Sequence, residues 1–214
     1  MAYFNEAERA RIARAVSAAQ GRTRGEIAAV IAREAGDYRF IPLLWASGLA
    51  FALPLPLIVL DAVLPDLGLS ALLIFEAQIL AFLCLALLFF WPPVKMRLIP
   101  RSLKRARAGH LARVQFLEQG LHHAEQHSGV MIFVSMAERY IEIVADEGIN
   151  DRVPPETWQE IVSAFIQDIR AERMTEAFES AIDSCGALLA QHYPAPATVP
   201  ARGQAAVGKA LIEL

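Results

Sequence analysis

Two long apolar segments in the middle of the chain restrict its fold more than any other feature. The first, IPLLWASGLAFALPLPLIVL, covers residues 41–60, and the second, SALLIFEAQILAFLCLALLFFW, covers residues 70–91. A helix rises about 1.5 Å per residue, so each segment can cross a bilayer core about 30 Å thick. Pro54 and Pro56 predict a kink in the first segment, since transmembrane helices tolerate proline. We therefore predict a transmembrane helical hairpin over residues 41–94.

The charges around the hairpin predict its orientation. Residues 41–94 contain no Lys or Arg, whereas seven arginines lie in residues 1–40 and seven basic residues lie in residues 95–113. The positive-inside rule then places both termini and the charged flanks in the cytoplasm, with the connector between the spans outside. The N-terminal sequence has no signal-peptide core. We expect a multi-pass protein of the inner (cytoplasmic) membrane, with the lipid bilayer as a partner.

Two features of the spans leave alternatives open. Glu76 is an ionisable group within a span, which is a candidate for function, but it lies only about 9 Å from the start of its helix. It can reach the outer interface or become neutral, and we favour this interpretation over a functional role. The basic stretch after Trp91 is best interpreted as a stop-transfer flank, although it can also bind anionic headgroups. Trp45 and Trp91 lie near one end of the two spans, as interfacial anchors do.

The sequences on either side of the hairpin each contain part of an α/β domain. In residues 1–40, Asn5 and Glu8 form a capping-box pattern that begins a helix, and Gly21 ends it. The stretch EIAAVIA, residues 26–32, is then expected to be a short buried strand. One helix and one strand cannot cover both faces of that strand, so this part is not a domain by itself.

Residues 95–192 supply the missing elements. A helix continues from the basic stretch toward Gly129, and the apolar run VMIFVSM, residues 130–136, is typical of a central strand covered on both faces. A tight connection leads to a second strand at residues 140–145, which predicts a β-hairpin. Two amphipathic helices follow, the first beginning near Pro155.

These parts predict an α/β fold: a layered domain with a mixed sheet and flanking helices, split by the transmembrane hairpin. Residues 1–40 form its first part and residues 95–192 its second, on either side of residues 41–94. Residues 193–214 are a Pro- and Ala-rich tail, which we expect to be extended or disordered. Its last residues, AVGKALIEL, could dock as a short end segment.

Composition and motifs narrow the possible functions. The formal net charge of −3 and the lack of a basic–aromatic array give no indication of nucleic-acid binding. Cys84 and Cys185 have no metal-binding spacing, and we expect both to be free, buried thiols. The sequence shows no nucleophile–base arrangement and no glycine-rich phosphate loop. Enzymatic activity therefore stays open, with a noncatalytic role favoured.

Two sets of residues could still take part in chemistry. In HHAEQH, His123 and His127 are four apart, next to His122, and on one helix face that spacing can chelate a metal. No carboxylate completes the pattern, so solvent-facing or packing histidines are the alternative. Arg139, beside Glu138, could bind an anion or lie in a solvated turn, and we favour the structural role.

The stretch GVMIFVSMAERYIEIVADEGI resembles the central signature of the TPM domain, found in thylakoid-lumen photosystem repair proteins and many bacterial membrane proteins. The NEAERARI and EIAAVI stretches resemble that family's opening helix and first strand, so the resemblance covers about residues 3–193. The whole chain is similar to a bacterial membrane subgroup with a transmembrane hairpin inserted in the domain. The matching signature residues are Gly129, Val130, Ser135, Arg139, Ile143 and Gly148.

The resemblance implies two classes of function. One is a membrane-anchored accessory, assembly or maintenance factor of a membrane protein complex. The other is a phosphatase-like hydrolase or a metal-binding domain, since some relatives use acidic residues of these loops. Here Asp146 replaces the first of the family's paired glycines, and it forms an acidic loop with Glu147 and Asp151. Asp146 and Asp151 are the candidate metal ligands, with weak calcium binding at most and no other cofactor expected.

Overall fold

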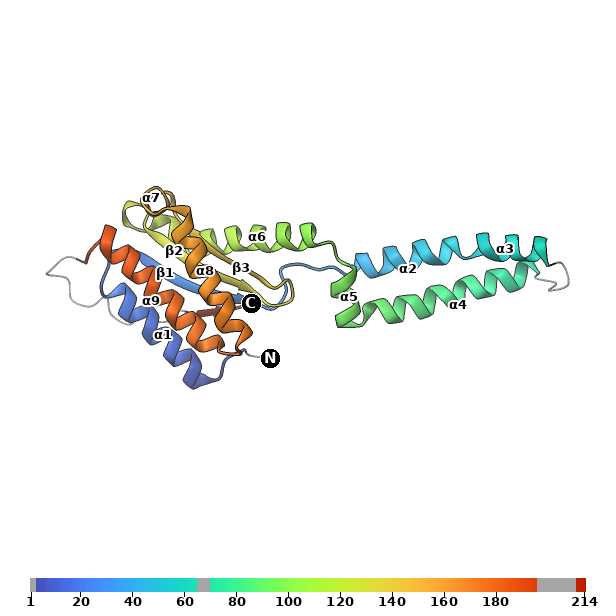
Figure 1. Ribbon diagram of the computed structural model, residues 1–214, viewed down its shortest axis with the longest axis horizontal. Coiled ribbons are helices and arrows are strands. Elements are labelled where there is room, and N and C mark those ends of the chain that lie inside the picture. The colour runs from blue at the N-terminus through green and yellow to red at the C-terminus, as the bar shows by residue number, and fades with distance from the viewer. Residues whose placement is uncertain (1–2, 65–69, 196–210) are drawn as a thin grey trace. The chain divides into compact units, whose positions relative to one another are not determined.

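The computed structural model describes residues 3–64, 70–195 and 211–214, and the chain divides into two compact units. The first, called the α/β unit below, contains Met1–Ala35 and Arg105–Leu214. The second, called the hairpin unit, contains Gly36–Lys104. Residues from both sides of the apolar segments thus fold into the same unit (Figure 1).

A four-stranded mixed sheet forms the centre of the α/β unit, in the order β3-β2-β1-β4. Its strands are β1 (Glu26–Ala32), β2 (Gly129–Ser135), β3 (Tyr140–Ala145) and β4 (Leu211–Glu213). β2 runs parallel to β1 and antiparallel to β3, as the predicted β-hairpin requires. The end segment does dock: β4 pairs parallel with β1. Of the predicted tail, residues 196–210 lie outside the described residues.

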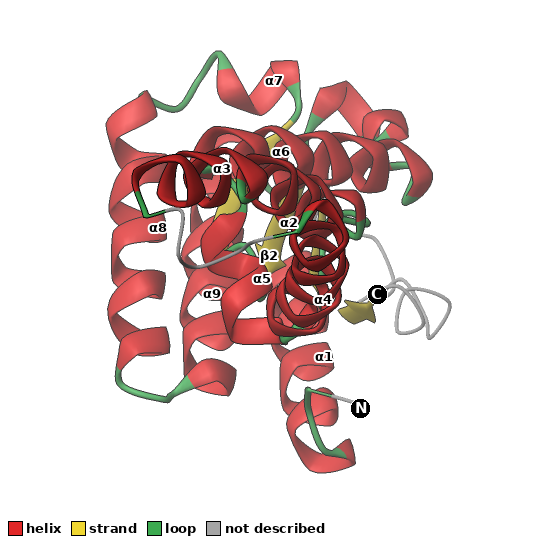
Figure 2. Ribbon diagram, turned by 90° about the vertical axis from the view of Figure 1, so that its right-hand side faces the viewer, coloured by secondary structure: helices red, strands yellow, loops and turns green. Residues whose placement is uncertain are grey.

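Helices cover both faces of this sheet, so the predicted α/β fold class is confirmed. On one face, α1 (Glu6–Gln20), α8 (Pro155–Arg170) and α9 (Met174–His192) pack on alternate strand residues such as Ile31 and Ile132. On the other, α6 (Arg101–Glu118) packs on Val30 and Phe133 through small side chains such as Ala108 and Ala112. Every residue of β2 is buried, as expected for a central strand. Figure 2 shows α9 between α8 and α1.

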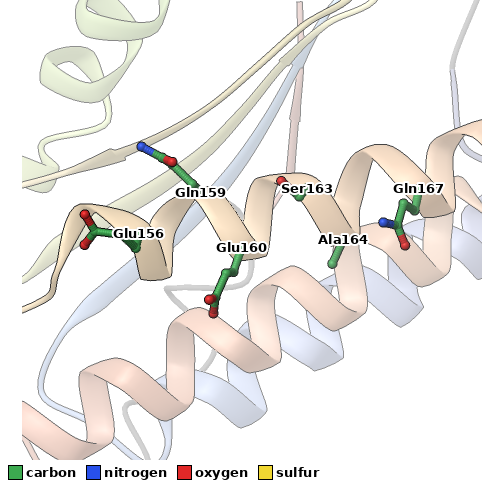
Figure 3. Close-up of a pocket in the computed structure, with 6 residues that line it drawn as sticks. All are labelled: Glu156, Gln159, Glu160, Ser163, Ala164 and Gln167. Carbon is green, nitrogen blue, oxygen red and sulfur yellow. The ribbon is translucent and has the colours of Figure 1, made fainter.

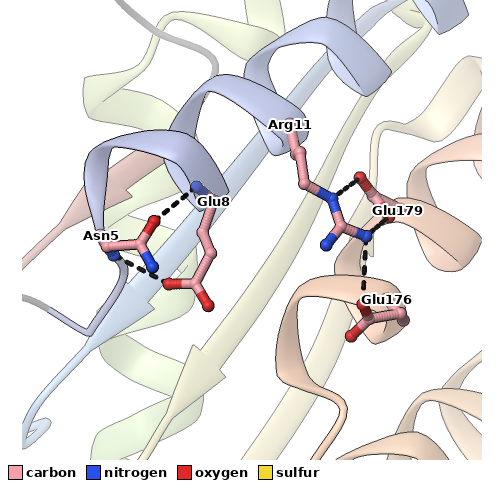
Figure 4. A network of polar contacts seen from close by, with 5 residues as sticks. All are labelled: Asn5, Glu8, Arg11, Glu176 and Glu179. Atoms are coloured by element: carbon pink, nitrogen blue, oxygen red, sulfur yellow. Dashed lines mark hydrogen bonds and ion pairs between the residues drawn. The ribbon is translucent and has the colours of Figure 1, made fainter.

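Polar contacts fix α1 at its beginning and against α9. The predicted capping box is present: Glu8 N donates to Asn5 Oδ1 at 2.9 Å, and Asn5 N donates to Glu8 Oε2 at 2.8 Å (Figure 4). One turn later, Arg11 donates to Glu179 at 2.9 and 2.6 Å and to Glu176 at 3.1 Å. These bonds to two carboxylates raise the pKa of Arg11 above its ordinary value. α1 and α9 are therefore joined by ion pairs above a shared apolar core.

The hairpin unit consists of α2 (Phe40–Ala52), α3 (Pro54–Val63), α4 (Ala71–Phe90), α5 (Pro92–Leu98) and the first residues of α6. α2 and α3 meet at Leu53, directly before Pro54, where the backbone keeps right-handed φ and ψ values of −59° and −41° and Leu53 N donates to Leu49 O. The expected kink therefore stays a prediction. Residues 65–69 of the connector lie outside the described residues.

Both apolar stretches of the hairpin unit are long and apolar enough to cross a bilayer. They are Phe40–Val63 and Ala71–Phe90, which contain 18-residue stretches with mean hydropathies of 2.1 and 2.5. Only 11% and 6% of the residues in these two stretches are buried. Cys84 on α4 is exposed, so the prediction that both thiols are buried is wrong for Cys84. The reason is that the described neighbours of α4, which are α2, α3 and α5, cover only part of its surface. Cys185 is buried among apolar side chains, which raises its pKa to about 12.

Candidate functional site

The acidic loop follows β3 and is held by a short helix, α7 (Glu147–Asn150). Asp146 is the N-cap of α7: its Oδ1 accepts from Glu147 N at 2.9 Å, and its own N donates to Gly129 O at 2.9 Å. Asp151 is the C-cap, with its backbone N bonded to Glu147 O, and its side chain is exposed. The loop is therefore ordered mainly by its backbone, with Asp146 as the side chain that begins the helix.

The two candidate carboxylates stand at opposite ends of α7. Asp151 follows Asp146 by five positions, so their Cα atoms are about 7.5 Å apart along the helix axis. Among the described residues, no group of three or more His, Cys, Asp or Glu side chains is placed to hold a metal ion. Weak calcium binding by Asp146 and Asp151 stays a prediction.

The predicted helix through the histidines is wrong. α6 ends at Glu118, and Gly120 follows with a φ of 72°, a left-handed conformation that stops the helix. His123 lies in one 3-10 turn, η2 (Leu121–His123), and His127 in another, η3 (Glu125–His127). They do not share a helix face, so the i, i+4 geometry that could have allowed metal chelation is absent.

The histidines make other contacts instead. The rings of His122 and His123 lie against each other, with centroids 3.8 Å apart and planes tilted by 44°. His127 Nδ1 lies 3.3 Å from Asp146 Oδ2. The Asp146 side chain is 14% exposed and that of His127 is 66% exposed. The structure thus brings one predicted metal ligand next to one of the histidines, across the gap between η3 and α7.

Close backbone packing explains two glycines of the signature. A Cβ at Gly148 would lie 2.2 Å from Gln126 O and 2.8 Å from His127 O. A Cβ at Gly129 would lie 2.3 Å from Leu121 O. Gln126 and His127 themselves have φ values of 56° and 54°, left-handed values that are uncommon outside glycine. The acidic loop therefore rests directly on the 3-10 turns, and only glycine fits at the two contacts.

The β2–β3 turn holds the next part of the signature. Glu138 Oε1 accepts from Ala35 N at 3.0 Å, and Ser135 Oγ donates to Glu138 Oε2. Arg139 is exposed and takes the left-handed position of the turn, with a φ of 52°. Glu138 thereby links Ala35, the last residue of the first part of the α/β unit, to the β2–β3 turn.

A polar pair on the α6 side of β3 was not found from the sequence. Tyr140 OH donates to Glu142 Oε2 at 2.9 Å, beside Gly109 of α6, where a Cβ would lie 3.3 Å from the same hydroxyl. Burial and this hydrogen bond raise the pKa of Tyr140 to about 12, partly offset by Arg113 and Arg105. Side chains two residues apart in a strand lie on the same face, so Tyr140 and Glu142 share one face of β3. This spacing is the only feature of the sequence that could have indicated the pair.

A shallow depression on the surface of α8 is lined by residues of that helix alone, and all but Ala164 are polar (Figure 3). It contains two carboxylates and one hydroxyl, and no histidine, cysteine or arginine. The lining residues are Glu156, Gln159, Glu160, Ser163, Ala164 and Gln167.

Comparison with known proteins supports the resemblance over part of the chain. Residues 98–188 match the family model of the TPM domain. The NMR structure of BA42 protein, from the psychrophilic bacterium Bizionia argentinensis, has a similar fold, with a TM-score of 0.53 and 16% sequence identity. The alignment covers 90% of this chain and 86% of that chain. At this identity the likeness concerns the fold alone. No curated protein sequence matches the chain.

Proposed function

We propose that this chain is a TPM-like domain of the membrane subgroup, anchored in the inner membrane by a hairpin inserted between β1 and β2. It serves as a noncatalytic accessory, assembly or maintenance factor of a membrane protein complex. The observation that carries the proposal is the exposed apolar surface of the hairpin unit. Leu44, Phe51 and Leu87 are 68%, 74% and 78% exposed. A continuous apolar surface of this kind marks a membrane or protein contact.

The charges of the hairpin unit support the proposed orientation. α2 and α4 pack together, so the start of α2 lies beside the end of α4 (Figure 1). Arg39 precedes α2, and Lys95 and Arg97 follow α4, whereas Asp61 and Glu76 lie toward the connector. The basic end is therefore the cytoplasmic end. Glu76 is exposed in the second turn of α4, where it can reach the outer interface.

Two measurements test the anchor and the accessory role separately. Membrane fractionation of cells that express the full chain should recover it with the membranes, even after washing at high salt or alkaline pH. Gentle detergent purification should then recover a membrane complex in fixed stoichiometry. Recovery in the soluble fraction would contradict the anchor. A chain that purifies alone from every mild detergent would contradict the accessory role.

The alternative, a hydrolase that uses the acidic loop, predicts a different result. Purified protein would turn over a phosphomonoester in the presence of calcium or magnesium, and Asp146→Asn with Asp151→Asn would abolish the turnover. We expect neither this activity nor a large stabilisation by calcium. Ligand at a hundredfold excess over its dissociation constant stabilises a protein by about 2.7 kcal/mol. A shift of that size in millimolar calcium, lost in the double variant and retained in Glu156→Gln with Glu160→Gln, would favour the alternative.

A further inference from the structure

We infer that the short basic segment after α4 binds the phosphate groups of anionic lipid headgroups. The segment, called the basic collar, consists of Lys95, Arg97, Arg101 and Lys104 in α5 and the start of α6. This inference rests on the proposed membrane anchor. It specifies the class of lipid that the protein prefers around that anchor.

The two arginines of the basic collar have no acidic neighbours along the chain. No Asp or Glu occurs between Glu76 and Glu118. Arg97 and Arg101 are exposed, and neither has a hydrogen bond or an ion pair with any residue that the structure describes. Arginine that pairs with protein carboxylates, as Arg11 does, has little left to offer a ligand. The two collar arginines keep all of their donors available, and guanidinium donors match phosphate oxygens in pairs.

The collar is also held in place by packing. α4 ends at Phe90, the next residue Trp91 turns the chain with a ψ of 125°, and Pro92 begins α5. Ile99, after α5, is buried with Tyr38 and Ile41 in a small apolar core of the hairpin unit. Partly buried side chains of α5 and α6 surround this core: Met96, Leu98 and Leu103.

A hydrogen bond joins the two helices that carry the collar. Lys104 Nζ donates to Met96 O, so the start of α6 is tied to α5. α5 in turn contacts both α2 and α4 at the end of the hairpin. The basic side chains therefore extend from a packed support and not from an extended flank, which reduces the conformational entropy lost on binding.

Aromatic residues place the collar at the depth of the headgroups. Trp91 is 63% exposed, and Trp45 and Phe40, near the start of α2, are 50% and 51% exposed. Exposed tryptophans at the end of a span lie at the membrane interface. Lys95 and Arg97 follow Trp91 by four and six residues. The phosphates of the same leaflet lie within reach of these bases. An ordinary stop-transfer flank needs positive charge but neither this support nor free arginines.

The test uses the full chain in bilayer nanodiscs made from an equal mixture of phosphatidylcholine and phosphatidylglycerol. Native mass spectrometry then measures which lipid remains bound as the disc is removed. We expect phosphatidylglycerol to be retained over phosphatidylcholine, and Arg97→Gln with Arg101→Gln to reduce this preference about fivefold for each arginine removed. Arg97→Lys with Arg101→Lys should retain part of it, because the charge remains while the paired donors are lost.

The control removes the same charge elsewhere. Arg24→Gln with Arg170→Gln changes two exposed arginines of the α/β unit and should leave the lipid preference unchanged. Equal retention of both lipids by the unaltered chain, or an equal preference in the collar variant and the control, would overturn the inference while leaving the anchor intact. Failure of the chain to enter nanodiscs of either lipid would instead overturn the proposed function.

Discussion

At Gly148 a single hydrogen atom in place of a side chain allows the acidic loop to rest on the 3-10 turns. Gly148→Ala places a Cβ where backbone oxygens of Gln126 and His127 already lie. Overpacking of this kind typically costs about 1–3 kcal/mol, and we expect that loss in the free energy of unfolding, measured with denaturant on the full chain in detergent.

Gly21→Ala is the matched control for this prediction. Gly21 lies in the same unit, has a right-handed φ of −65°, and would place its Cβ in ordinary contact with Ser17 O at 3.4 Å. Its effect should be within about 0.5 kcal/mol. Equal losses at both positions would show that the loop yields to the added methyl group and that close packing does not require glycine there.

Tyr140 predicts a particular response to alkaline pH. Its pKa is raised from 10.0 to about 12 in the folded chain, mainly by burial and then by the Glu142 hydrogen bond. The unfolded chain therefore loses this proton first as the pH rises. The stabilisation is fully present below about pH 10 and is lost between about pH 10 and 12. Tyr140→Phe should flatten that part of the stability profile, measured by chemical denaturation, and an unchanged slope would contradict the assignment.

At the scale of elements, the strands were the most predictable from sequence and the segment around the histidines the least. β1 and β3 begin and end where their apolar patterns do, and β2 differs from its predicted bounds by one residue at each end. Residues that favour a helix continue in the sequence after Glu118. The end of α6 is therefore visible only in the structure, where Gly120 takes a left-handed conformation. β4 has three residues, too few for a periodicity signal.

The candidate site was likewise predictable from the sequence only in part. The position of Asp146 and Asp151 after a half-buried strand could be predicted, because the strand pattern ends there. The contact between His127 and Asp146 could not, since it depends on two left-handed residues in a segment with no sequence periodicity. The pair of Tyr140 and Glu142 depends on which face of β3 meets α6, and a single strand's sequence does not determine that.

The orientation of the hairpin is testable by labelling. In a Cys84→Ser background, Leu64→Cys at the connector should react with a membrane-impermeant thiol reagent added to intact cells. Asn150→Cys, at the exposed end of α7, should react only after the membrane is opened. Cys185 is buried and should not contribute. The reverse pattern would place the α/β unit outside the cytoplasm, as in exported members of the TPM family.

For the whole molecule, the division into units predicts that the α/β unit folds without the spans. Replacement of residues 37–98 by a short flexible linker should give a soluble protein with one cooperative unfolding transition, because closing such a loop costs little entropy. Calorimetry and circular dichroism should report the same midpoint. Two separate transitions, or no folded product, would contradict a shared core.

The parallel pairing of β1 with β2 also sets an order of events during synthesis. β1 is complete before residues 33–128 exist, and those residues include both apolar helices. Ribosomes add about 5–20 residues per second, so β1 waits roughly 5 to 20 seconds for its neighbour while the hairpin unit is made. Six of its seven residues are buried in the finished fold and exposed during that wait. If the hairpin is inserted in the membrane as proposed, a newly made chain passes through a stage in which an unpaired, apolar strand is held next to the bilayer, and protection of that strand by a chaperone would determine how much protein matures.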